Sequence, residues 1–202
     1  SGEQRVEPSE PSMRGPMWER IGTPRLPVAA GANRFTWDLS LAGPWDQNAA
    51  RSGRNGPTLV PGAYRVRLTS GAWSATRSLT IKPDPRIVAD GVTIPVMQEL
   101  LDHNIAVREL VSDLNRFTTD VEDAYRSADG TKKTRISEVR DVIQSEPWRY
   151  GRPGLATHIQ YLYGAMMRAD QKVGNDAKQR LVQLRKELTD VQAKFRAAIT
   201  AM

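Results

Sequence analysis

The chain has 202 residues, of which 39% are apolar and 26% charged, and its 29 basic and 23 acidic side chains leave a net charge of +6. These proportions are typical of a soluble protein with one generous domain or two small ones, and they exclude disorder throughout the chain. No apolar run approaches the length of about 20 residues that a helix needs to span a bilayer. The absence of cysteine excludes disulfides, thiol catalysis and cysteine-bound zinc.

The basic excess is spread along the chain and does not predict a nucleic-acid partner. Residues 1–92 carry 12 basic and 8 acidic side chains, and the rest of the chain carries 17 and 15. A groove that follows a phosphate backbone requires basic residues interleaved with aromatic ones, and no such run occurs. Charges of mixed sign are typical of an ordinary solvated surface.

Residues 1–30 are predicted to form an extended arm, because prolines recur along them without any clear periodicity. The arm nevertheless carries three large apolar side chains. Groups of this size are unusual in a free linker, so we expect the arm to pack on its own protein or on a partner protein. The candidate interface residues in the arm are Met13, Met17 and Trp18.

Residues 31–88 are predicted to form a small antiparallel β domain that resembles a sandwich. Apolar and polar residues alternate in NRFTWDL (33–39) and in GAYRVRLTS (62–70), so each strand should bury one face. The turn SGAW (70–73) should lead to a further strand, with Leu79 and Ile81 facing inward, before prolines end it.

A long loop, residues 41–62, separates the first two of these strands and is rich in Gly, Asn and Pro. It carries Trp45, and Trp73 lies at the turn of the hairpin. Both tryptophans are candidate contacts with another protein. The alternative is a carbohydrate- or ligand-binding accessory module, because sugar rings stack on exposed aromatic side chains.

Residues 93–202 are predicted to form an antiparallel bundle of three to four helices, which makes the fold class α+β. Thr93 is of a residue type that caps helix starts, and after it apolar residues from Leu100 to Ala124 recur every three or four positions. Further helices are expected over 134–146, after Gly154 and from Asn175 onward, with apolar stripes that can cover one another.

Three stretches carry a resemblance to a known family: GANRFTWDLSLAGP (31–44), GPTLVPGAYRVRLTSG (56–71) with LTIKPDPR (79–86), and LATHIQYLYGAMMRAD (155–170). They are similar to the C-terminal region of bacterial secreted proteins with BNR or sortilin-like propeller repeats, often labelled glycosyl hydrolases. The resemblance implies a small immunoglobulin-like β domain, a terminal helical region and a periplasmic or secreted location. The propeller is absent from this sequence, and SADGTKKT (127–134) does not match an Asp-box, so a hydrolase function is not expected.

Motifs for catalysis, cofactors or metals are also missing from the sequence. His103 and His158 are the only histidines, and each lies among apolar neighbours at helical spacing, where a packed histidine is expected rather than a ligand. We therefore predict no catalytic, cofactor-binding or metal-binding residue and no enzyme. The expected function is a non-catalytic extracytoplasmic scaffold or adaptor that docks on a larger protein assembly, such as an extrinsic subunit of a membrane complex. The alternatives are the accessory module and a remnant of a glycosyl hydrolase.

Overall fold

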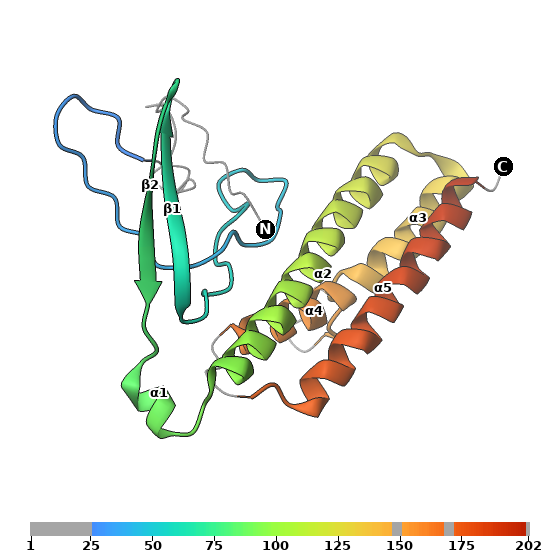
Figure 1. The fold of residues 1–202 in the computed structure, drawn as a ribbon. Coiled ribbons are helices and arrows are strands. Elements are labelled where there is room, and N and C mark those ends of the chain that lie inside the picture. The colour runs from blue at the N-terminus through green and yellow to red at the C-terminus, as the bar shows by residue number, and fades with distance from the viewer. Residues whose placement is uncertain (1–25, 147–150, 168–171, 201–202) are drawn as a thin grey trace.

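The computed structural model describes residues 26–146, 151–167 and 172–200, in which helices follow one antiparallel β hairpin (Figure 1). The predicted α+β class is therefore confirmed, whereas a sandwich is not, because the described residues form a single two-stranded sheet. Met13, Met17 and Trp18 lie outside the described residues. The elements are β1 (Gly62–Ser70), β2 (Trp73–Ile81), α1 (Pro85–Ala89), α2 (Ile94–Ser127), α3 (Gly130–Ile143), α4 (Leu155–Met166) and α5 (Asn175–Thr200).

Helix α2 is the longest element, and it begins where the sequence predicts. Thr93 occupies the N-cap in an extended conformation and Pro95 lies in the first turn, where a missing N–H costs nothing. At about 1.5 Å per residue the helix is about 51 Å long, so it needs partner helices along its length. Its buried apolar residues follow the predicted spacing and include Val107, Leu110, Leu114, Phe117 and Val121.

Helices α3 and α4 follow one another along the two long helices α2 and α5, and both contact each of them (Figure 1). A connection of only two residues, Ala128 and Asp129, makes α3 antiparallel to α2. Within the core, the rings of Phe117 and Phe195 meet edge to face with centroids 5.5 Å apart. The predicted bundle thus consists of α2, α3, α4 and α5.

Among the described residues, the apolar core lies in this bundle. Every buried large apolar side chain outside proline lies between Leu101 on α2 and Ala198 on α5. In the preceding part of the described chain, Gly56 and Pro57 are the residues that reach full burial. The bundle is therefore the part of the described structure that can supply most of the hydrophobic stabilisation.

The hairpin forms with the predicted turn, in which Gly71 adopts a φ of +57° that glycine tolerates well. The pairing runs from Gly62 opposite Ile81 to Ser70 opposite Trp73. The expectation that each strand buries one face is wrong, since eight of the nine residues of β1 are exposed. The apolar periodicity is present, but no layer of described residues covers it.

The predicted strand over residues 33–39 is also wrong. This segment is not a strand, and the only ladder contact nearby is a single bridge between Ser40 and Thr58. Leu39 has a left-handed φ of 63°, and the Asp38 carboxylate accepts hydrogen bonds from the Ser40 backbone at 3.0 Å and hydroxyl at 2.5 Å. An Asx turn of this kind offers the backbone an alternative to sheet pairing, so it ends the extended run.

Candidate functional site: an exposed hairpin beside a docked loop

The long loop between residues 39 and 59 is folded back on itself. The backbone N–H of Leu41 donates to the Pro57 carbonyl at 2.8 Å, and the Gly43 N–H donates to the Gly53 carbonyl at 2.8 Å. The two limbs run so close that a Cβ at Gly43 would lie 1.6 Å from the Arg54 carbonyl oxygen. Glycine is therefore required at this crossing, and the loop has a defined shape rather than that of a free linker.

Side chains of α2 hold this loop by its backbone. Ser112 Oγ accepts a hydrogen bond from the Trp45 N–H at 3.0 Å, and Asn115 Nδ2 donates to the Trp45 carbonyl at 2.7 Å. One turn away, Arg108 donates to the Ala42 carbonyl at 3.1 Å. Because these bonds reach loop backbone atoms, they depend on the helix residues more than on the identity of the loop side chains.

Helix α4 adds a further contact to the loop. The Tyr163 hydroxyl donates to the Asn55 carbonyl at 2.5 Å. Burial raises the pKa of Tyr163 to about 12, so the hydroxyl keeps its proton and stays a donor at neutral pH. The loop is therefore fixed to two different helices of the bundle.

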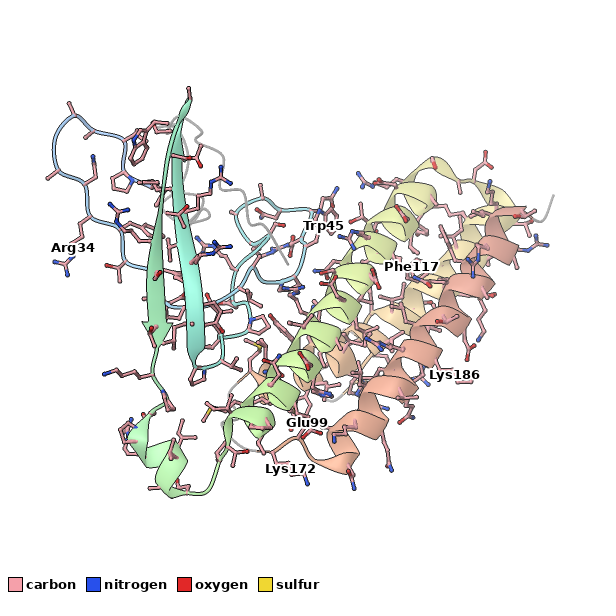
Figure 2. All side chains as sticks on the ribbon, in the orientation of Figure 1. Arg34, Trp45, Glu99, Phe117, Lys172 and Lys186 are labelled. Carbon is pink, nitrogen blue, oxygen red and sulfur yellow. The ribbon has the colours of Figure 1, made fainter. Side chains whose placement is uncertain are left out.

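Trp45, a predicted interface residue, lies in this intramolecular contact. Its side chain, labelled in Figure 2, is half-buried. The Arg116 guanidinium stands 5.4 Å from the ring centroid. An arginine at this distance from an indole is a cation–π contact, and it leaves less of the ring available for stacking on a sugar. Trp73, in contrast, follows the turn at the end of the hairpin and is 56% exposed. The two tryptophans thus belong to different surroundings.

Sequence reasoning missed the α2 residues that hold the loop. They form a polar stripe beside the apolar seam at intervals of four, three and four residues: Arg108, Ser112, Asn115 and Thr119. That spacing places them on one helix face, so the sequence alone could have indicated a polar contact surface on α2. Ser112 is buried, as expected for a polar group that has found its partners.

The hairpin presents one apolar face and one polar face, both largely exposed. On β1 the apolar face carries Tyr64, Val66 and Leu68, and Val66 and Leu68 are 45% and 48% exposed. The register places β2 residues beside them on the same face: Trp73, Ala75, Arg77, Leu79 and Ile81. Arg77 stands opposite Val66 within this otherwise apolar face. Exposed apolar side chains gathered on one face are typical of an interaction surface.

The hairpin is also strongly basic. Its charged residues are Arg65, Arg67 and Arg77, with no acidic residue between Gly62 and Ile81. None of the three forms an ion pair within the described residues, whereas Arg51 and Arg86 pair with nearby aspartates. The hairpin therefore carries an uncompensated charge of +3.

No comparable concentration of chemistry is found elsewhere in the described structure. The described residues contain no group of three or more histidine, aspartate and glutamate side chains placed to hold a metal ion. His103 is buried in the bundle, and burial, followed by the charges of Lys178 and Arg185, lowers its pKa. Its Nε2 atom has no hydrogen-bond partner among the described residues. Burial in a helical core fits the expected packed histidine better than a catalytic base open to a substrate.

Two acidic residues on α5 form ion pairs with basic residues of the same helix. Glu187 pairs with Arg180 at 3.4 Å, and Asp190 pairs with Lys186 at 2.7 Å.

None of the described helices combines the length and the apolar character needed to cross a membrane. Comparisons with protein-family models, curated proteins and solved structures find no match.

Proposed function

We propose that this chain is a non-catalytic docking subunit that joins a larger protein assembly through its hairpin. The observation that supports the proposal is the contrast between a bundle with a complete apolar core and a hairpin with an uncovered apolar face. An isolated two-stranded hairpin is marginally stable in water, because it has no second layer to bury its side chains. Contact with a partner would supply that layer.

The docked loop gives this surface a fixed base. Ser112, Asn115 and Tyr163 hold the loop on the bundle, and β1 begins directly after it. The Tyr64 hydroxyl also donates to the Val60 carbonyl at 2.7 Å, which connects the start of strand β1 to the end of the loop. A surface held in this way loses less conformational entropy on binding than a free hairpin would.

The resemblance described above supports an extracytoplasmic location and a small immunoglobulin-like β domain. We propose that the sandwich expected for residues 31–88 is completed by strands from outside the described residues when the subunit docks. An extrinsic subunit of a membrane complex is one such arrangement. The arm with Met13, Met17 and Trp18 is proposed as a second, separable contact.

The experiment compares the native size of the full chain with that of a variant in which Val66 and Leu68 are replaced by Ser. Extracts of the source organism that express each tagged chain are resolved by native electrophoresis. We expect the wild-type chain to run in an assembly well above its own mass of 22.5 kDa. The variant should run alone while its helical thermal unfolding is unchanged, because both side chains are already about half exposed.

A matched control replaces Val182 by Ser, since this residue is 68% exposed on α5 and lies outside the hairpin. This control should remain in the assembly. Deletion of residues 1–30 tests the arm separately and should weaken the assembly without unfolding the bundle. A wild-type chain that runs alone under all conditions would contradict the proposed function.

A further inference from the structure

Resting on the proposed docking function, we infer that the outer edge of β1 accepts an extended strand of a partner protein in which apolar and acidic residues alternate. The inference names the chemistry of the partner at the hairpin. It depends on three features of β1: a backbone edge and a positive charge that have no partner among the described residues, and an alternation of side chains.

The outer edge of β1 has backbone groups available for pairing. Within the described residues, β2 is the strand paired with β1, and no other backbone hydrogen bond reaches Gly62–Ser70. A strand of nine residues is long for an edge, and this one contains neither a proline nor a bulge in its pairing with β2. Such an edge is a template for a further strand.

The side chains of β1 define what the added strand should carry. Tyr64, Val66 and Leu68 lie on one face, and Arg65 and Arg67 on the other. A strand paired with this edge places its own residues directly beside these side chains, alternating between the two faces. Apolar residues would extend the apolar face, and carboxylates at the intervening positions would neutralise the two arginines.

The edge of β2 lacks this specificity. Its polar face carries only short hydroxyl side chains, and its apolar face is interrupted by Arg77. The polar residues of β2 are Ser74, Thr76, Ser78 and Thr80. Alternation of charge with apolar side chains is therefore a property of β1.

A second copy of this chain is a poor occupant. If two β1 strands paired antiparallel with Val66 opposite Val66, Arg65 of each copy would lie beside Arg67 of the other. Like charges directly opposite one another destabilise a strand pair. The hairpin has no acidic residue that could relieve this repulsion.

A lipid surface and the N-terminal arm fit less well than a partner strand. A lipid surface could attract the arginines and the apolar face, but hydrocarbon offers no partners for the unpaired N–H and C=O groups. The arm contains Pro8, Pro11, Pro16 and Pro24, each of which removes a donor that a strand ladder needs.

The test uses the full chain and a fluorescein-labelled peptide of nine residues in which valine alternates with glutamate. Binding is measured by fluorescence anisotropy. We expect saturable binding that weakens with added salt, because the charges on the exposed edge are screened. Two matched peptides should fail to bind: one with lysine in place of glutamate, and one with alternate backbone amides methylated so that they cannot pair.

The decisive variant reverses both charges, as Arg65→Glu with Arg67→Glu. Charges on an edge strand can also serve only to prevent aggregation, and either sign would do that. If that were their whole role, the reversed variant would stay soluble and bind the glutamate peptide as wild type does. We expect instead a loss of about tenfold or more and a gain of binding to the lysine peptide. Arg65→Lys with Arg67→Lys should bind as wild type does.

Each remaining outcome has a clear meaning. Absence of peptide binding by the full chain, together with strong binding after deletion of residues 1–30, would show that the arm covers the edge and would overturn the inference. Binding to vesicles of anionic lipid without binding to the peptide would also overturn it. If the Val66 and Leu68 variant leaves the native assembly but the charge-reversed variant does not, the docking function stands and the strand inference fails.

Discussion

The contrast between bundle and hairpin predicts that the same substitution, leucine to alanine, lowers the stability of the protein at one position and weakens partner binding at another. Leu114 is 1% exposed in the core of the bundle, and Leu68 is 48% exposed on β1. Both side chains lie at positions where an apolar residue is expected from the sequence pattern. Leu114→Ala should destabilise the protein strongly, and Leu68→Ala should affect binding instead.

The magnitudes follow from burial. At about 0.8 kcal/mol for each buried carbon removed, Leu114→Ala loses about 2.4 kcal/mol in transfer free energy alone. The cavity left between the helices adds to this, so the total should reach about 3 to 5 kcal/mol. For Leu68, about half of the side chain is already in water and no enclosed cavity forms, so the loss should be at most about 1.2 kcal/mol.

The assay is urea unfolding followed by circular dichroism at the helical minimum, which reports on the bundle. Leu114→Ala should lower the midpoint without changing the slope, and Leu68→Ala should leave both almost unchanged. If Leu68→Ala destabilises the protein as much as Leu114→Ala, the hairpin face is buried by the chain itself. The exposed docking surface would then be refuted.

Three further predictions concern the bundle and the loop. The pKa of His103 is lowered below its ordinary value of 6.5, so the unfolded chain binds a proton at a higher pH than the folded chain does. The free energy of unfolding should therefore fall as the pH drops below about 6.5. Between about pH 7.5 and pH 5.5, the urea midpoint should fall less for His103→Gln than for the wild type. Asn115→Ala removes the hydrogen bond to the Trp45 carbonyl and should lower the free energy of unfolding by about 1 kcal/mol. It should also speed amide hydrogen exchange at Gly43, whose N–H is bonded within the loop. The control Asp120→Ala, on an exposed position of α2, should change neither quantity. A fragment from about residue 88 onward should be soluble and helical, because the core lies within α2–α5, and a circular dichroism spectrum of mostly coil would refute this.

The bundle could be predicted from the sequence because its signals are local. The spacing of Val107, Leu110, Leu114 and Phe117 determines which face of α2 is buried, and that face needs no knowledge of distant residues. Helix α4 begins directly after Gly154 and α5 begins at Asn175, and both residue types are typical of helix starts in a sequence.

The β part was harder to predict, because the alternation of apolar and polar residues indicates a tendency to form a strand but does not show whether another layer covers its apolar face. In β1 the alternation does form a strand, but the burial it suggests depends on a second layer that the sequence pattern cannot supply. In residues 33–39 the alternation competes with the turn at Asp38, and the turn prevails. The docked loop depends on pairs such as Trp45 with Asn115, which are 70 residues apart and have no joint sequence signature.

An exposed hairpin can persist in this chain because the helical bundle supplies most of the stability of the fold. Native proteins are stable by only about 5 to 15 kcal/mol, so an uncovered apolar face is tolerated only when stability is supplied elsewhere. Here the bundle supplies it, and Ser112, Asn115 and Tyr163 hold the loop on that bundle without covering the hairpin that follows. In the docking function proposed above, the arginines of β1 would have two roles: to keep the edge soluble before a partner strand pairs with it, and to favour a strand that carries the opposite charge. Both roles would then be combined within the nine residues of β1.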